Sequence, residues 1–185
     1  MKNIVKPPEN YNLLDERWIP VLYHDGRMER IGICKALENA HMIRQIAASN
    51  PMDRVAILRF LLALLYWCKG NPPDPFSDGS FPSNWFTKLN DNKDCFNLLG
   101  DGKRFYQYNG KGNNGKLSAN YLVQEIPTGT NLWHFRHSTD GDNGLCPPCC
   151  AMGLLRLPLF ATSGGRGKPP GINAKPPIYV IPLGS

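Results

Sequence analysis

The chain has 185 residues and a formal net charge of +6 at pH 7; 42% of its residues are hydrophobic and 19% are charged. This length and balance allow a single domain with its own core and exclude an intrinsically disordered chain. No acidic residue follows Asp142, so the basic excess lies toward the C-terminal end. Positive charge suits an anionic partner such as nucleic acid, although many basic proteins bind none.

The cysteines and the apolar runs indicate the cellular compartment of the protein. Residues 1–12, MKNIVKPPENYN, lack the apolar core of a signal peptide, and the chain holds six cysteines. Without a signal, reduced thiols or a metal site are favoured over a disulfide framework. The longest apolar run, residues 55–67, is broken by Arg59 and is too short to span a bilayer. We therefore expect a cytoplasmic protein that does not enter a membrane.

The first half of the chain predicts a hairpin followed by a long helix. In residues 12–33 the apolar segments WIPVLY and RIGI flank HDGR, whose Asp-Gly pair is a strong turn signal. Residues 34–46 have a mixed, partly helical periodicity. The clearest helix begins at Asn50 as a cap, with Pro51 in its first turn and Asp53 near its positive end. Its apolar character predicts the central helix of the core, ending at Gly70.

The second half is less regular. Residues 81–100 predict a second helix, and KRFYQY at 103–108 predicts a short strand. Residues 117–126 are compatible with a helix or an extended segment, 127–144 form a polar loop with an aromatic centre, and 145–160 predict a helix after two prolines. Because helices and strands mix without a βαβ rhythm, we expect one irregular α+β domain over residues 1–185, with a buried central helix and short antiparallel strands.

Two motifs carry possible chemistry. Gly110, Gly115 and Lys116 have the spacing of a phosphate loop, but Leu117 stands where Ser or Thr must hold Mg²⁺, which favours a solvated turn. Cys146 and Cys149 in CPPCC could share one tetrahedral metal or form a redox pair. Zinc would need two further ligands, and the alternative is a pair of buried thiols that pack the turn before a helix. The candidates for the further ligands are Cys68, Cys95, His134 and His137.

No set of nucleophile, base and orienting residue stands out, so we expect no enzymatic activity. The loop NLWHFRH is more informative, because Trp133 and Phe135 offer flat faces for unstacked bases. Arg136 can meet a phosphate, and His137 can donate a hydrogen bond. The alternative is that the aromatic residues only anchor the loop to the core.

Glycine, proline and positive charge alternate in the segment SGGRGKPPGINAKPP. Its glycines allow the backbone to approach a ligand closely, while prolines limit how far the loop can wander. Arg166 suits a narrow minor groove of DNA, and Arg166 and Lys168 both attract phosphate groups. The alternative is an ordinary surface loop. The predicted DNA-binding residues are Ser163, Gly164, Gly165, Arg166, Gly167 and Lys168.

The segment NLLDERWIPV at 12–21 resembles the N-terminal signature of the CasA family, the large subunit of the type I-E CRISPR Cascade complex. Similar landmarks follow in the family's order. They are a core helix after NPMDRVAIL, an RFYQ strand, an aromatic loop, a CxxC before an apolar helix, and a glycine-rich basic loop. The resemblance covers essentially the whole chain.

The resemblance implies a non-catalytic subunit of an RNA-guided surveillance complex in antiviral defence. Its implied partners are guide RNA (crRNA), target double-stranded DNA and other Cascade subunits. In the family, the glycine loop lies against the duplex that carries the PAM, the short DNA motif next to the target, and residues 163–167 match it here. The loop ahead of the CxxC reaches the 5′ end of the guide RNA, and Phe135, Arg136 and His137 match that position.

Two departures from the family pattern limit what is carried over. Ser163 and Arg166 stand where family members can have glycine, which leaves the PAM preference open. Family members usually carry more chain, including a C-terminal helical bundle, whereas this sequence stops at Ser185. We expect it to be either a truncated or partial form, or a naturally shortened variant whose missing part is supplied elsewhere. Separation of the DNA strands and docking of a helicase-nuclease belong to that region. The alternatives from the residues themselves are a stand-alone zinc-containing nucleic-acid-binding module and a nucleotide hydrolase that uses Lys116.

Overall fold

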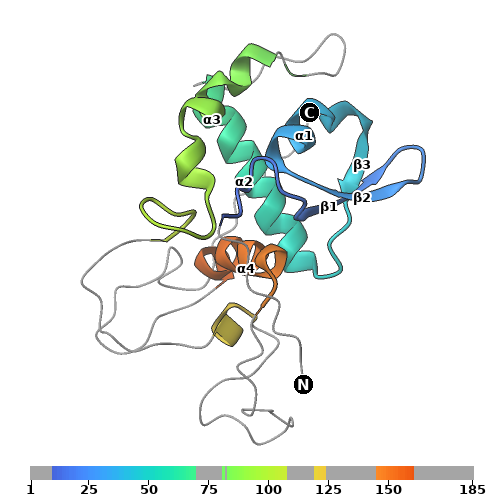
Figure 1. The fold of residues 1–185 in the computed structure, drawn as a ribbon. Helices are drawn as coiled ribbons and strands as arrows, with labels where there is room; N and C mark the ends of the chain where they lie inside the picture. Colours follow the sequence, from blue (N-terminus) through green and yellow to red (C-terminus); the bar gives the residue numbers. More distant parts are fainter. Residues whose placement is uncertain (1–9, 70–80, 82, 108–118, 124–144, 161–185) are drawn as a thin grey trace, which may run out of the picture.

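A computed structural model describes residues 10–69, 81, 83–107, 119–123 and 145–160. Its elements are a small sheet, a long helix α2 (Pro51–Lys69), a group of short helical turns, and a helix α4 (Pro147–Phe160) that runs across the N-terminal half of α2 (Figure 1). Among the described residues, no helix has the length and apolar character needed to cross a membrane.

Three antiparallel strands form the sheet in the order β2–β1–β3. They are β1 (Ile19–Tyr23), β2 (Met28–Ile31) and β3 (Ile43–Ile46). The predicted hairpin is confirmed: Ile19 pairs with Ile31, and Gly26 in the turn has φ of 88°, which favours glycine. Alternate residues of β1 are buried, so one face of the sheet packs on the core.

A short helix α1 (Ile33–Glu38) and a 3₁₀ turn η1 (Ala40–Met42) connect β2 to β3, which agrees with the partly helical periodicity. The chain enters α1 at Gly32, where an added Cβ would lie 2.4 Å from the carbonyl oxygen of Leu14. The neighbouring amide of Ile33 donates a hydrogen bond to the carbonyl oxygen of Leu13 at 3.1 Å. Only glycine therefore fits where α1 crosses the segment before β1.

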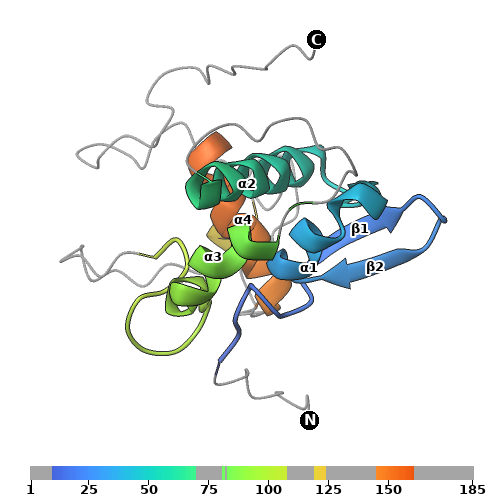
Figure 2. The same ribbon diagram turned by 90° about the horizontal axis from the view of Figure 1, so that it is seen from above.

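Helix α2 (Pro51–Lys69) is confirmed with its predicted cap, because the Asn50 Oδ1 accepts a hydrogen bond from the Met52 amide at 2.8 Å. One face is buried in the core, but the opposite face remains exposed. The buried face includes Ala56, Ile57, Phe60, Leu64 and Leu65, and the exposed apolar residues include Val55, Leu58, Leu62 and Tyr66. The expectation of a central helix thus holds for one face only (Figure 2).

The predicted second helix over 81–100 is wrong as a continuous helix. Its described part contains η2 (Ser83–Phe86), α3 (Thr87–Asp91) and η3 (Lys93–Phe96). The Asn92 side-chain amide donates to the Lys88 carbonyl at 2.9 Å, so it satisfies a backbone acceptor where α3 ends. Local capping by Asn92 explains why the helix stops after one turn.

The predicted strand at 103–108 is also wrong over its described residues. Arg104 and Gln107 form an isolated bridge around a tight turn in which Tyr106 has φ of 53°. The Phe105 ring is buried and meets the ring of Phe60 edge-to-face, with 5.3 Å between centroids. Packing of this aromatic residue against α2 therefore replaces strand pairing.

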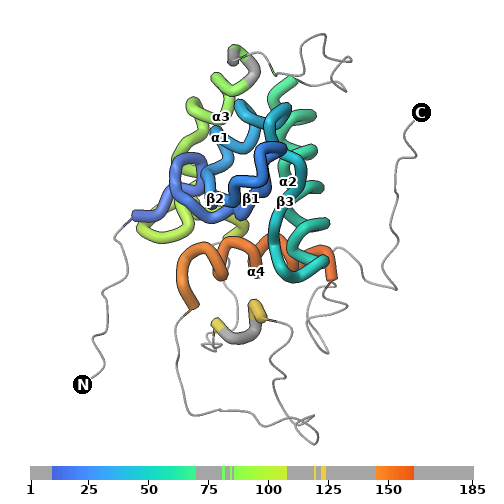
Figure 3. The backbone as a smooth tube through the Cα atoms, turned by 90° about the vertical axis from the view of Figure 1, so that its right-hand side faces the viewer, coloured from blue at the N-terminus to red at the C-terminus, as the bar shows by residue number. Residues whose placement is uncertain are grey.

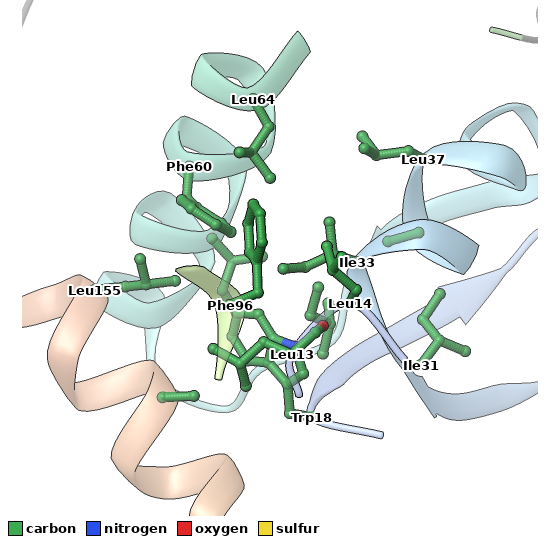
Figure 4. Close-up of a cluster of buried hydrophobic side chains, with 14 of the residues drawn as sticks. Leu13, Leu14, Trp18, Ile31, Ile33, Leu37, Phe60, Leu64, Phe96 and Leu155 are labelled. Carbon is green, nitrogen blue, oxygen red and sulfur yellow. The ribbon is translucent and has the colours of Figure 1, made fainter. Parts of the chain in front are cut away.

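The predicted helix is confirmed as α4 (Pro147–Phe160), except that it begins at the two prolines and not after them. The turn η4 (Ala119–Leu122) lies on the side of α4 away from α2 (Figure 3). The core lies between the sheet, α2 and α4, where Phe96 sits beside Phe60 and above Leu13 and Trp18 (Figure 4). The described residues thus agree with a mixed α+β fold. The expected loop at 127–144 lies outside them, as do residues 110–118.

Candidate nucleic-acid interface

Helix α4 separates the two segments that are predicted to contact nucleic acid. Phe135, Arg136 and His137 precede it in the chain, and residues 163–168 follow it. Both segments lie outside the described residues, as does Lys116 of the phosphate-loop-like motif. The structure therefore defines the helix between the two segments and the contacts that hold this helix in place.

A buried ion pair joins α4 to α2. The Arg156 Nη1 lies 3.5 Å from the Asp53 Oδ1, and the two side chains are only 6% and 12% exposed. The sequence predicts an interaction of Asp53 with the positive end of α2; the structure adds its pairing with an arginine far away in sequence. Because both charges are shielded from water, removal of either one would deprive the other of its compensating charge.

The same arginine also holds the end of η4. The Arg156 Nη2 donates a hydrogen bond to the Leu122 carbonyl oxygen at 2.8 Å. One turn earlier in α4, a Cβ added at Gly153 would lie 2.7 Å from the Leu122 Cβ and 2.8 Å from its carbonyl oxygen. The backbone of η4 thus approaches α4 at a point where a side chain would collide with it.

The CxxC thiols lie at the start of α4. The Cys146 Sγ is 3.0 Å from the Cys149 Sγ, and the Cys150 amide donates to the Cys146 carbonyl at 3.0 Å. Burial raises the pKa of Cys149 to about 11, and its hydrogen bond with Cys146 acts in the same direction. Burial also raises the pKa of Cys150. These two thiols are therefore protonated at neutral pH, unlike an activated nucleophile.

Zinc coordination stays a prediction. Within the described ranges, no group of three or more His, Cys, Asp or Glu side chains could hold a metal. Cys68 and Cys95 thus do not complete a set with the CxxC, while His134 and His137 lie outside those ranges. The described thiols supply at most two of the four ligands that a structural zinc site needs.

Sequence reasoning missed the contacts that hold α4. Arg156 is a charged residue within the apolar helix segment GLLRLPLF, and Gly153 stands inside the helix, where glycine is unfavourable. Both residues could have indicated these contacts from the sequence. A buried charge needs a partner, and a glycine inside a helix often marks a place where another backbone segment packs closely. Their partners, Asp53 and Leu122, could not be identified from sequence spacing.

Comparisons with known proteins agree with the resemblance described above. The sequence model of a family described as CRISPR-associated protein Cse1 matches residues 12–180. The CasA/Cse1 protein of Thermus thermophilus is 32% identical over 139 residues, which cover 71% of this chain and 28% of that protein. The crystal structure of Thermobifida fusca Cse1 has a TM-score of 0.72 at 25% identity and covers 84% of this chain and 31% of that one.

A chain of a solved CRISPR RNA-guided surveillance complex has a TM-score of 0.71 at 18% identity and covers 85% of this chain and 36% of that chain. At this identity the likeness concerns the fold alone. The present chain spans about three tenths of the length of the Cse1 relatives described above, with 28% and 31% covered.

Proposed function

Since this chain belongs to the CRISPR-associated protein Cse1 (CasA) family, we propose that it is a non-catalytic subunit of a type I-E Cascade surveillance complex. It contacts PAM-containing double-stranded DNA through residues 163–168 and the 5′ end of the guide RNA through residues 135–137. Its partners are these nucleic acids and the other Cascade subunits. The observation that carries this proposal is the family match over residues 12–180, which includes both segments.

The chemistry of the two segments supports this division of work. In the first, glycines at 164, 165 and 167 let backbone atoms approach a DNA groove, while Arg166 and Lys168 meet phosphates. In the second, Phe135 stacks on a base, a contact worth about 1–3 kcal/mol. Arg136 and His137 add charge and hydrogen bonds. Guide pairing reads the target sequence, so the protein needs to read only the short adjacent motif.

The first test concerns the DNA contact. Complexes assembled with the Arg166→Ala, Lys168→Ala and double variants are titrated with PAM-containing duplex over a range of salt concentrations. Each substitution should weaken binding and lower the salt slope by about one charge. Lys175→Ala, which also removes a lysine beyond α4, is the matched control and should change the slope less. Unchanged slopes in all variants would show that the loop does not contact DNA.

The second test separates the two segments. A bulky residue at Gly164 or Gly165 should reduce PAM-dependent binding more than guide-RNA association. Its side chain would prevent the loop backbone from approaching the DNA groove closely. Phe135→Ala should show the reverse order. Equal losses in both assays would indicate misfolding rather than loss of a contact. The assays use complexes isolated by co-purification of the chain with guide RNA.

The 3.0 Å contact between the CxxC thiols favours a second candidate, a stand-alone zinc-containing nucleic-acid-binding module. Its further ligands would come from residues outside the described ranges. Metal analysis of the purified chain distinguishes the two functions. Stoichiometric zinc that disappears with Cys146→Ser or Cys149→Ser, together with unfolding, would support the second candidate. Nucleic-acid binding that persists without metal would exclude it.

A further inference from the structure

We propose that Asp53, Gly153 and Arg156 form a clamp on the Leu122 carbonyl that positions the segment entering residues 124–144. We call these three residues and that carbonyl the Leu122 clamp. Its functional consequence rests on the proposed function, because residues 135–137 lie within this segment. The clamp itself consists only of described residues and can be tested separately.

The first step is steric. Gly153 and Arg156 are three residues apart in α4 and therefore lie on one face of the helix. The Leu122 carbonyl oxygen is 2.8 Å from the Arg156 Nη2 and would be 2.8 Å from a Cβ at position 153. Real Cβ atoms do not approach other atoms this closely, so any larger residue at 153 must displace η4.

The second step is electrostatic. Arginine presents its donors in a rigid, planar fork, and the clamp uses two of its nitrogens for different partners. Nη1 faces Asp53 on α2 at 3.5 Å, while Nη2 faces the Leu122 carbonyl. The Asp53 charge therefore attracts one side of the guanidinium group toward α2, while the opposite nitrogen donates its hydrogen bond to the Leu122 carbonyl. Lysine carries its three donors on one nitrogen, so it cannot place two separate nitrogens against Asp53 and the Leu122 carbonyl.

The third step explains why a charged cluster is used. Well-packed apolar residues of similar volume often replace a buried ion pair without loss of stability. Ala151 and Leu155 of α4 are buried, so the packing of α4 against α2 would be possible without charges. An apolar pair could not accept or donate a hydrogen bond, however, so it could not hold a backbone carbonyl at one position. The charged cluster thus supplies placement that apolar packing cannot.

The fourth step connects the clamp to the segment. Leu122 is the last residue of η4, and residues 124–144 run from there to Leu145 and the start of α4. Both ends of this segment are thus attached to α4, one through the clamp and the other through the chain itself. Holding the two ends at a fixed separation lowers the entropy that the segment loses on binding.

The experiment compares three clamp variants in the full chain, alone and assembled with its complex. They are Gly153→Ala, Arg156→Lys and the apolar double variant Asp53→Leu/Arg156→Met. We expect the double variant to keep a near-normal unfolding midpoint. In all three, hydrogen exchange of the amides at 119–123 should become about tenfold faster. Guide-RNA association should weaken in parallel, as it does in Phe135→Ala.

The outcomes are distinguishable. Unchanged exchange at 119–123 in folded Gly153→Ala and Arg156→Lys overturns the clamp. Faster exchange with normal RNA association, in a complex where Phe135→Ala does weaken it, overturns the positioning role. If Phe135→Ala has no effect, the proposed RNA contact fails, while the exchange measurement still decides whether the clamp exists. Should the double variant unfold, Arg156→Lys provides the decision, because it retains a long cationic side chain at position 156 and leaves Gly153 unchanged.

Discussion

Asn12 and Arg156 both fasten a distant part of the chain to the core, but they use different chemistry. The Asn12 side-chain amide donates to the Asn97 Oδ1 at 2.7 Å and to the Lys93 carbonyl at 3.0 Å, and its Oδ1 accepts from the Leu14 amide. Two backbone hydrogen bonds run alongside, from Leu13 to Phe96 and from Leu98 to Tyr11. Arg156 instead relies on a charge that is paired with Asp53.

The two anchors differ in the groups that remain buried when one partner is removed. Around Asn12 the groups are neutral, and the parallel backbone bonds keep the two segments together. Around Arg156 the loss of either partner leaves a charge in a place shielded from water, which is far more costly. We therefore expect the α4 anchor to be the more sensitive one, and the following measurements test this ranking.

The largest effect is expected for Arg156→Ala. Loss of the arginine removes the positive charge that lies 3.5 Å from the buried Asp53 carboxylate, so the free energy of unfolding should fall by about 3–5 kcal/mol. Urea unfolding followed by circular dichroism measures it. The Asp53→Leu/Arg156→Met variant is the control and should lie much closer to the unchanged protein. A loss below about 1 kcal/mol for Arg156→Ala would contradict the ranking, since that is typical of exposed pairs.

Asn12→Ala should have an intermediate effect. It leaves the Leu14 amide and the Lys93 carbonyl without their side-chain partner, which costs about 1–3 kcal/mol for a buried group. The same unfolding assay applies. Asn12→Asp keeps an acceptor for the Leu14 amide but loses the donor, so it separates the two halves of the anchor. A loss as large as that of Arg156→Ala would show that neutral and charged anchors are equivalent.

Asn50→Ala should have a smaller effect, because it removes only the cap of α2. The Met52 amide loses its 2.8 Å hydrogen bond, and the usual cost is about 1 kcal/mol. Asn50→Ser restores a capping oxygen and should recover most of the stability. This variant sharpens the comparison because Asp53 lies in the same first turn. If the cap loosened the ion pair as well, the loss would approach that of Arg156→Ala.

Lys93→Ala should change stability little, within about 0.5 kcal/mol. Its ammonium group lies 2.7 Å from the Asp15 Oδ2, a shorter distance than in the buried pair, but both side chains are more than half exposed. Asp15→Ala is the matched partner variant. Comparison with Arg156→Ala therefore separates the effect of burial from that of distance. An equal loss for both lysine and arginine variants would mean that burial does not set the ranking.

Ionisation of two partly buried thiols, Cys34 and Cys149, should have no effect on stability at neutral pH and a destabilising effect in alkali. Burial raises the pKa of Cys34 and of Cys149 from 9.0 to about 11. At neutral pH these thiols are protonated in both folded and unfolded chains, so their contribution is constant. As the pH rises from 9 toward 11, the unfolded chain ionises first and stability falls. Unfolding midpoints measured across this alkaline range test the expectation.

Cys34→Ala and Cys149→Ala should each flatten part of that alkaline decline. The first reports on the region near the Asn12 anchor, because the Cys34 amide donates to the Leu14 carbonyl. The second reports on the start of α4. A decline that is identical in both variants and in the unchanged chain would assign the pH dependence to other groups.

The local features of the fold could be predicted from the sequence. Asp25–Gly26 identified the hairpin turn, and Asn50 with Pro51 identified the start of α2, since both signals act within a few residues. The errors arose where tertiary packing decides. Phe105 packs on Phe60 instead of extending a strand. The residues next to either phenylalanine in the sequence give no indication of this contact.

The candidate interface was predictable only in its residue types. Glycines with cations and an aromatic loop pointed to nucleic acid, and those segments stay predictions because they lie outside the described residues. The Leu122 clamp was not predictable, since its members come from three separate parts of the chain. A buried arginine and an interior glycine in α4 indicated that a partner exists, but only the fold identifies it.

The origin of the ion pair has a consequence for the order of folding. The sheet and α2 come from one continuous stretch, residues 19–69, so their contacts are short in sequence and can form early. Arg156 emerges much later during synthesis. Until it arrives, the ion pair between Asp53 and Arg156 cannot form. Docking of α4 then closes the core as a late event in biogenesis.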